Sequence, residues 1–330
     1  MPHARLLGKR LGFGIAALIL LVAGGLAAAI AFGGPGQLPP LSRSNPFEGA
    51  DFSRLPAVER FAARDGARLV YRTYGQDTAS VRSTVVLIHG SSSRSDRMHP
   101  LAMGLAAAGH VVHALDIRGH GESGVKGQIA YIGQLEDDLE DFMSAVRPSG
   151  RKSLVGFSAG GGFALRFAGD TRRGLFDNYL LLAPLLGPRA STYRPAGGGW
   201  ASVGVPRIVA VSVLDRVGIS TFNELPVVIF ALRPEFRDVL TPYYSLALAR
   251  NFGPHLNYRG DIAAVSQPME VLVSDGDEQF YPDRFSSEFA SARRKVPVSI
   301  VPGVGSHIGL TLAPVGIEAI VSAMGRLNGK

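Results

Sequence analysis

The pentapeptide Gly156-Phe157-Ser158-Ala159-Gly160 follows an apolar run over 153–157, typical of a buried strand, and precedes a small-residue segment over 161–168, typical of a helix. A Gly-x-Ser-x-Gly pattern at such a junction predicts a sharp turn that holds the serine above the sheet. Because the chain has 41 glycines, the pentapeptide alone could arise by chance, and its position gives it weight. We expect Ser158 to be a nucleophile, with Gly156 and Gly160 leaving room for the turn to close.

A serine hydroxyl needs a neutral imidazole to take its proton and a carboxylate to orient that imidazole. His307 is the histidine in a glycine-flanked loop after the last expected strand. The preceding strand ends in Asp275-Gly276-Asp277. Asp277 is favoured because it stands further into the loop, and Asp275 is the alternative, with a role in shaping the turn. The order Ser158, Asp277, His307 is the triad order of an α/β-hydrolase.

Acyl chemistry also requires hydrogen-bond donors for the oxyanion that forms during attack. We expect the backbone N–H groups of Ala159, directly after the nucleophile, and of Ser91, directly after His89-Gly90, to serve as this oxyanion hole. His89 itself is interpreted as a loop-shaping residue. The same interpretation applies to Arg118 and His120 in a glycine-rich turn.

The rest of the chain alternates short apolar runs with helical patterns. Asp65-Gly66 predicts a tight antiparallel hairpin within 58–74. Helices are expected over 100–109 and over 132–146, where the apolar residues share one face. The alternation predicts an α/β fold with a mostly parallel eight-stranded sheet and helices on both faces. The runs expected to be buried strands are 84–89, 111–116, 153–157, 179–183, 269–273 and 298–301.

Between 185 and 259 the alternation lapses into a segment rich in Gly and Pro with several apolar clusters. Its length is sufficient to cover the carboxyl ends of the strands, where ligands bind in such folds. We interpret it as a cap inserted into a hydrolase domain that spans 57–330.

The N-terminal segment carries no charged residue from Leu11 to Phe32. This uncharged stretch is long enough to span a bilayer. Arg5, Lys9 and Arg10 precede it and, by the positive-inside rule, keep the N-terminus in the cytoplasm. We therefore expect residues 1–34 to be a single-pass membrane anchor, with the catalytic domain on the periplasmic or extracellular side. A signal peptide cleaved near Ala31, giving a secreted protein, is the alternative. Residues 35–56 are expected to form a linker.

Composition narrows the chemistry further. The chain of 330 residues has a formal charge of +7 but no run of Lys and Arg, so a nucleic-acid partner is not expected. It has no cysteine, which excludes disulfides, thiolate zinc sites and a cysteine nucleophile. No His-Glu-x-x-His motif or dinucleotide fingerprint is present, and neither a metal nor a cofactor is expected.

The segments His89-Gly90, Arg118-Gly119-His120-Gly121, Gly156 to Gly160 and the Asp277 and His307 loops together resemble the α/β-hydrolase superfamily over nearly all of 57–330. Two further stretches, 116–142 and 180–184, look like the lysophospholipase and monoacylglycerol lipase group, which is also grouped with serine aminopeptidases. This resemblance implies a serine esterase whose substrate is an ester with one acyl chain. Ser274 departs from the pattern, since such enzymes usually have glycine there.

The leading hypothesis is hydrolysis of lipid-like carboxylic esters through an acyl-enzyme. Acyl transfer or peptide hydrolysis on the same triad is an alternative, because the core sequence does not determine the acceptor. A membrane-tethered binding protein that has lost the chemistry is another, since fold does not imply activity. The oligomeric state is left open.

Overall fold

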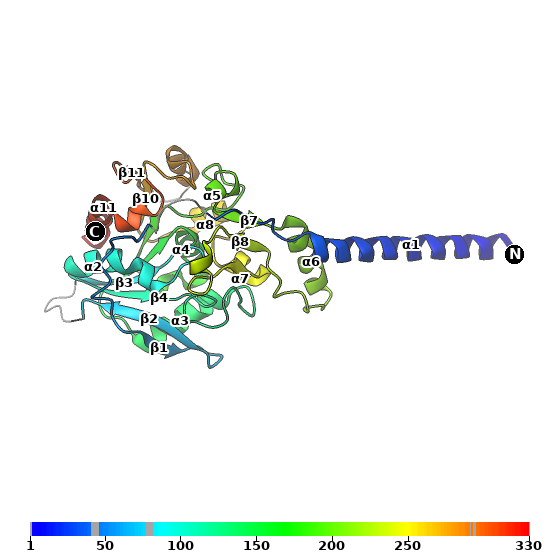
Figure 1. The fold of residues 1–330 in the computed structure, drawn as a ribbon, viewed down its shortest axis with the longest axis horizontal. Coiled ribbons are helices and arrows are strands. Elements are labelled where there is room, and N and C mark those ends of the chain that lie inside the picture. The colour runs from blue at the N-terminus through cyan, green and yellow to red at the C-terminus, as the bar shows by residue number, and fades with distance from the viewer. Residues whose placement is uncertain (1, 41–45, 77–81, 291, 293–294, 330) are drawn as a thin grey trace.

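A computed structural model describes residues 2–40, 46–76, 82–290, 292 and 295–329, with side chains from residue 13 onward. Its centre is an eight-stranded sheet in the order β1-β2-β4-β3-β5-β6-β10-β11 (Figure 1). The β1–β2 and β2–β4 pairs are antiparallel and the other pairs are parallel, which confirms the mostly parallel sheet. The strands are β1 Glu59–Ala62, β2 Arg68–Tyr74, β3 Ser83–Ile88, β4 His110–Leu115, β5 Lys152–Phe157, β6 Asn178–Leu182, β10 Met269–Ser274 and β11 Val298–Val301.

Helices cover both faces of the sheet (Figure 1). α2 packs against α11, and α4 packs against α8. β3, β6 and β10 are buried along their whole length, which explains why they read as unbroken apolar runs. The helices are α2 His99–Ala107, α3 Gln134–Val146, α4 Ala159–Gly169, α8 Tyr258–Ala264, α9 Phe285–Phe289, α10 Gly309–Leu312 and α11 Pro314–Asn328, with short 3₁₀ turns at Ser95–Met98, Thr171–Leu175, Pro234–Phe236 and Pro282–Arg284.

The chain between β6 and β10, which we term the insertion, was expected to act as a cap. Its strands form a separate antiparallel sheet in the order β7-β8-β9. Pro206 stands in the first turn of α6, where the missing N–H costs no hydrogen bond. Ser245 accepts a hydrogen bond from the N–H of Leu248 and so caps α7. Before α8 the insertion contains α5 Ala196–Gly199, β7 Ala201–Val203, α6 Val205–Arg216, β8 Val228–Phe230, β9 Tyr243–Tyr244 and α7 Leu246–Asn251.

The N-terminal helix α1, Pro2–Phe32, projects from the rest of the molecule as a rod (Figure 1). By length and composition its part from Phe13 to Phe32 could cross a membrane, and a membrane anchor and a signal sequence both fit this finding. The side chains of Arg5, Lys9 and Arg10 lie outside the described part of α1. Of the expected linker, 41–45 lies outside the described residues, and the chain after it packs on α2 through Phe52 and His99, whose ring centroids are 5.6 Å apart.

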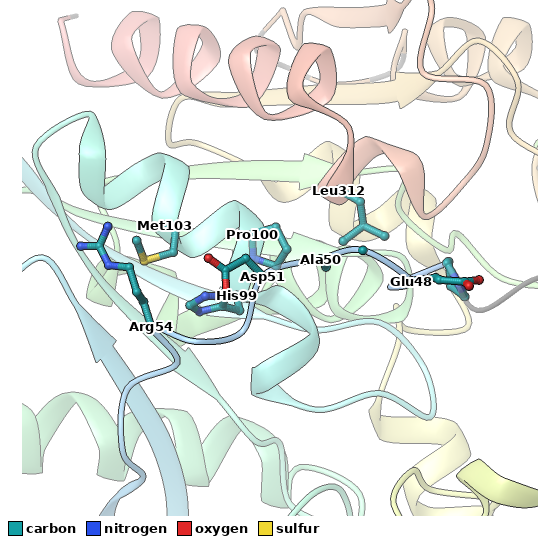
Figure 2. Close-up of a pocket in the computed structure, with 10 residues that line it drawn as sticks. Glu48, Ala50, Asp51, Arg54, His99, Pro100, Met103 and Leu312 are labelled. Carbon is teal, nitrogen blue, oxygen red and sulfur yellow. The ribbon is translucent and has the colours of Figure 1, made fainter.

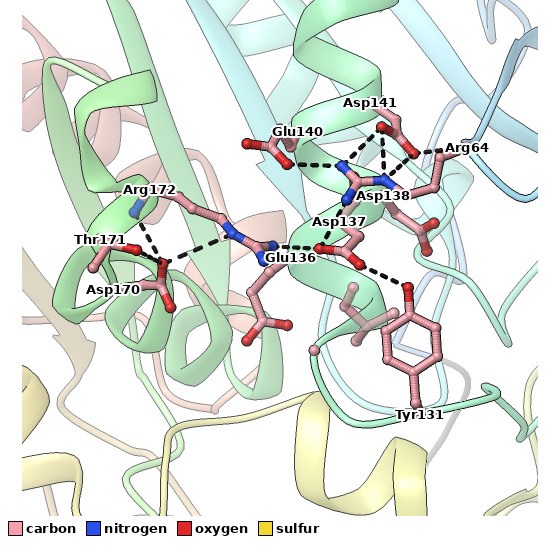
Figure 3. A network of polar contacts seen from close by, with 12 residues as sticks. Arg64, Tyr131, Glu136, Asp137, Asp138, Glu140, Asp141, Asp170, Thr171 and Arg172 are labelled. Carbon is pink, nitrogen blue, oxygen red and sulfur yellow. Dashed lines mark hydrogen bonds and ion pairs between the residues drawn. The ribbon is translucent and has the colours of Figure 1, made fainter.

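Helix α3 carries two kinds of ion pair. On its exposed side Arg64, from the β1–β2 turn, binds Asp141 and Glu140 (Figure 3). On its inner side Glu136 pairs with Arg166 of α4, and both side chains are buried. Glu136 also accepts a hydrogen bond from Asn251 at the end of α7. The inner pair therefore joins three helices behind the nucleophile turn, whereas the outer pairs are exposed and individually weak.

Replacing Glu136 with alanine is expected to lower the free energy of unfolding by about 3–5 kcal/mol, because it leaves the Arg166 guanidinium buried without its partner. Glu140→Ala is the matched control on the same helix, and it should cost about 1 kcal/mol or less because its ion pair is exposed. Urea unfolding of both variants measures the difference. Equal losses would contradict a special role for the buried pair.

Buried His113 makes stability depend on pH. Its ring packs edge-on against Tyr71 and Phe142, and its Nδ1 contacts the Thr73 hydroxyl at 3.1 Å. Burial lowers the pKa of His113 to about 4. The folded state therefore excludes a proton that the unfolded chain binds below pH 6.5. The free energy of unfolding should therefore be highest above pH 6.5 and fall as the pH drops towards 4. The expected loss between pH 7 and pH 5 is about 2 kcal/mol. His113→Gln should unfold with a correspondingly smaller pH dependence in urea titrations, and an unchanged pH dependence would contradict this assignment.

Candidate active site

Ser158 lies at the junction of β5 and α4 with a positive φ of 55° and ψ of −115°. Non-glycine residues rarely adopt this region, so the turn is strained. A side chain at Gly156 would overlap the carbonyl of Gly160, and one at Gly160 would overlap the carbonyl of His89. The Ser158 N–H donates to the carbonyl of Leu182 on β6 at 2.8 Å. Both glycines are therefore needed for β5 to turn directly into α4.

Asp277 and His307 meet beyond the ends of β10 and β11. Nδ1 of His307 lies 2.7 Å from one carboxylate oxygen of Asp277, and both side chains are buried. The other Asp277 oxygen accepts the N–H groups of Gln279 and Phe280 at 2.8 and 2.9 Å. With both oxygens occupied, the carboxylate is an acceptor fixed in orientation, and Nδ1 of the imidazole is the donor.

Asp275 has a different role in the same loop. Its carboxylate accepts the N–H groups of Gly303 and Gly305, at 2.7 and 3.1 Å, which joins the β10 loop to the loop that carries His307. The Gly303 and Gly305 hydrogen bonds lower the pKa of Asp275 below its ordinary value. In the described part of the chain its carboxylate forms no hydrogen bond with the imidazole, so the geometry supports turn shaping for this residue.

His307 presents its second nitrogen towards no protein partner. Nε2 is buried and makes no hydrogen bond within the described part of the chain. The ring of Phe157, the residue before Ser158, lies 4.7 Å from the imidazole centroid, and Phe280 lies 5.2 Å away. The structure forms no hydrogen bond between Ser158 and His307 in the described residues, and such contacts often tighten only when substrate binds.

The loop after β3 runs beside the nucleophile. A Cβ on Gly90 would stand 3.3 Å from the Cβ of Ser158. In the described part of the chain, the N–H of Ser91 donates to no protein acceptor. Ala159 is the first residue of α4, where backbone N–H groups have no partner within the helix. Two backbone donors without a protein acceptor in the described part of the chain thus flank Ser158, at the positions where the sequence predicts the oxyanion hole.

The insertion contributes residues that the sequence did not single out. Trp200 Nε1 donates to the hydroxyl of Ser91 at 2.9 Å. Ser92, which has a φ of 64°, donates its N–H to the Tyr244 hydroxyl at 2.7 Å and exchanges two hydrogen bonds with the backbone of Thr241. These pairs are separated by more than 100 residues, and no local pattern reveals such contacts.

The histidines of the neighbouring loops serve structural roles. His89 Nδ1 contacts the carbonyl of Gly90 at 2.7 Å, and its Nε2 accepts the N–H of Ile117. His120 Nε2 accepts from the Tyr244 hydroxyl at 2.7 Å. Burial lowers the pKa of both imidazoles, which keeps them neutral. Arg118 is held by the carboxylate of Asp138 at 2.6 Å.

Access to Ser158 is narrow, since only 5% of the residue is exposed. The glycine-rich α5 segment of the insertion passes over the loop after Asp277, where a Cβ on Gly198 would overlap the carbonyl of Glu278. A separate surface hollow lies between the segment before β1 and α2 (Figure 2). His99 and Asp51 line that hollow, and none of the three expected catalytic residues does. Among the described residues, no group of three His, Asp or Glu side chains is arranged to hold a metal ion.

Parts of the chain are similar to a peptidase family model and to a lipase. A family model described as serine aminopeptidase, S33, matches residues 79–223, a range that contains Ser158 and ends before Asp277. Monoacylglycerol lipase from Mycolicibacterium smegmatis is 37% identical over 113 residues, which are 32% of this chain and 39% of that lipase. The match therefore spans well under half of the relative's own length.

Solved structures share the fold over most of the chain. A soluble variant of monoglyceride lipase from Saccharomyces cerevisiae has a TM-score of 0.64 at 16% identity, covering 87% of this chain and 98% of that one. Monoacylglycerol lipase from Paleococcus ferrophilus has a TM-score of 0.57 at 20% identity, covering 79% and 98%. Together the matches confirm the α/β-hydrolase fold and the resemblance to the monoacylglycerol lipase and serine aminopeptidase group.

Proposed function

We propose that this chain, which has the α/β-hydrolase fold, is a serine hydrolase that cleaves lipid-like carboxylic esters with one acyl chain. The observation that carries the proposal is the buried Asp277–His307 hydrogen bond beside a serine on a strained strand-to-helix turn. A serine, an imidazole and a carboxylate in these positions have the roles of nucleophile, general base and orienting group.

In the proposed mechanism, Ser158 Oγ attacks the ester carbonyl while Nε2 of His307 takes its proton. Asp277 stabilises the imidazolium through Nδ1–H. The N–H groups of Ser91 and Ala159 donate to the oxyanion of the tetrahedral intermediate, each such donor being worth about 3 kcal/mol. The imidazolium then protonates the leaving alcohol, and an acyl-enzyme remains. Water, activated by the same imidazole, attacks this ester and releases the acid.

The choice of a lipid-like ester is supported by the similarity to monoacylglycerol lipases. The apolar insertion over the site and the apolar helix α1 also favour a substrate that partitions into membranes. We propose that α1 is retained as an anchor and places the catalytic domain on the non-cytoplasmic side. Acyl transfer and peptide hydrolysis use the same three residues, so the acceptor and the bond cleaved must be measured directly.

The test uses the full-length protein in mixed micelles. A fluorophosphonate probe should label wild type and not Ser158→Ala. The same samples are then assayed on a monoacylglycerol, a lysophospholipid, a short p-nitrophenyl ester and an aminoacyl p-nitroanilide. Turnover of the long-chain esters supports the proposal. Turnover of the anilide alone, or of the short ester alone, would overturn the lipid assignment, and failure of Ser158 to label would overturn the mechanism.

A further inference from the structure

Helix α6 of the insertion lies against the last turn of α1 (Figure 1). Arg207 makes the junction: its Nε donates to the carbonyl of Ile30 at 3.0 Å, and its Nη2 to that of Ala31 at 3.5 Å. A third donor, Nη1, bonds the carbonyl of Pro226 at 3.0 Å. The carbonyls at the end of a helix lack intrahelical partners and carry partial negative charge, so the guanidinium is a suitable cap.

Close packing supports the same junction. A side chain at Gly33 would overlap the Pro206 side chain of α6, and one at Gly34 would overlap the Arg207 guanidinium. Ile30 packs against an apolar cluster of the insertion that is formed by Val211, Val227 and Leu246. Helix α1 therefore joins the insertion through a packed contact, and its direction is set relative to α6.

The other side of α6 is apolar and exposed. Three valines of α6, and the valine directly after its last residue, recur at intervals of four residues and lie on the same side of the helix. We call this face the valine stripe; it consists of Val205, Val209, Val213 and Val217, all of them exposed. Val203 and Ile219, on either side, are exposed as well. Single exposed apolar residues are ordinary, whereas a continuous row beside an apolar rod indicates a surface with a partner.

The position of the stripe identifies that partner. The apolar part of α1, Phe13–Phe32, spans about 30 Å at 1.5 Å per residue, the thickness of a hydrocarbon core. Since α6 meets α1 at its last turn, the stripe lies level with the boundary between acyl chains and headgroups. A helix that exposes an apolar face next to a membrane span can bury that face in this boundary.

We propose that α6 is embedded in the outer surface of the lipid bilayer through the valine stripe, with Arg207 holding it to the end of a membrane-spanning α1. The proposal rests on the retention of α1 proposed above, and not on the chemistry of Ser158. It also connects the membrane to the site, because β8 and β9 join α6 to Tyr244. The N–H of Val227 donates to the carbonyl of Tyr244 at 2.9 Å, and the Tyr244 hydroxyl holds the loop of Ser92.

The absence of cysteine from the chain allows a single label to be placed cleanly. Val213→Cys, labelled with an NBD fluorophore, is compared with Val315→Cys on α11; the two valines are 38% and 39% exposed, so they are matched in accessibility. Both full-length proteins are reconstituted into phosphatidylcholine and phosphatidylglycerol vesicles with and without doxyl-labelled lipid. The emission of the label at position 213 should shift to shorter wavelength, and doxyl-labelled lipid should quench it at least twofold. The emission of the label at position 315 should remain as it is in water.

Adding Arg207→Ala to Val213→Cys should reduce the quenching, because it removes the cap on α1. Equal signals at 213 and 315 would overturn the proposal. A blue shift at 213 without quenching by doxyl lipid would also overturn it, since the stripe would then be covered by protein, such as a second copy of the chain. Fluorophosphonate labelling of the same samples reports separately on Ser158, so that failure of the membrane contact and failure of the proposed chemistry are distinguished.

Discussion

Replacing Ser158 with alanine is expected to reduce kcat for ester hydrolysis by about 10⁶-fold. The proposed acyl-enzyme forms on the Ser158 hydroxyl, and Asp277 and His307 act only by activating that hydroxyl. Alanine removes one oxygen and retains the Cβ that the turn accommodates at a φ of 55°, so the fold should persist. Steady-state turnover of a monoacylglycerol measures the loss, and thermal unfolding measures the fold.

Ser153→Ala, on the strand that leads into the nucleophile turn, is the matched control for that variant. Ser153 is buried on β5, and its hydroxyl has no hydrogen-bond partner among the described residues, so its removal should leave kcat within a factor of about two. A Ser158→Ala protein that keeps more than one hundredth of wild-type turnover would show that hydrolysis does not pass through this serine.

Asp277→Asn is expected to reduce kcat by about 10⁴-fold, the size of the effect that the same substitution has in a serine protease. The expected cause is a change in which nitrogen of His307 carries the proton. In the native protein, one Asp277 oxygen accepts from Gln279 and Phe280, and the other faces Nδ1 of the imidazole. The two N–H donors should hold the oxygen of the new amide, which turns its NH₂ group towards Nδ1. The imidazole must then carry its proton on Nε2, where it cannot take the proton of Ser158.

Asp275→Asn provides the control for the acid. Asp275 stands two residues away and accepts the N–H groups of Gly303 and Gly305, so its replacement should lower the stability slightly and change kcat little. If Asp275→Asn caused the larger loss of kcat, the roles of the two carboxylates would be reversed.

The contacts of Trp200 and Tyr244 give the insertion a part in the proposed chemistry. Both side chains bond the loop of Ser91 and Ser92, which is the loop proposed to supply an oxyanion donor. Movement of the insertion to admit substrate would therefore also move this loop. The proposed membrane contact at α6 is connected to the same loop through β8 and β9.

The fold and the order of the expected active-site residues could be read from the sequence because both depend on local patterns. Short apolar runs mark buried strands, and the glycines of 156–160 mark a turn that only a compact backbone can make. The same reasoning found the two carboxylate positions of the β10 loop, since the strand ends at Ser274 and the side chains that follow must lie at the same sheet edge as His307. The sequence favoured Asp277 over Asp275 for the contact with the imidazole, on the ground of its position further into the loop.

Tertiary structure decided the remaining questions, because they concern contacts between segments that are far apart in the chain. Asp277 meets His307 while Asp275 binds the glycine N–H groups, a division that depends on how two loops pack. The capping of α1 by Arg207 joins positions 30 and 207, and the valine stripe becomes an exposed face only once the other side of α6 is buried. A periodic sequence predicts that a helix has faces, and only packing determines which face is left for a partner.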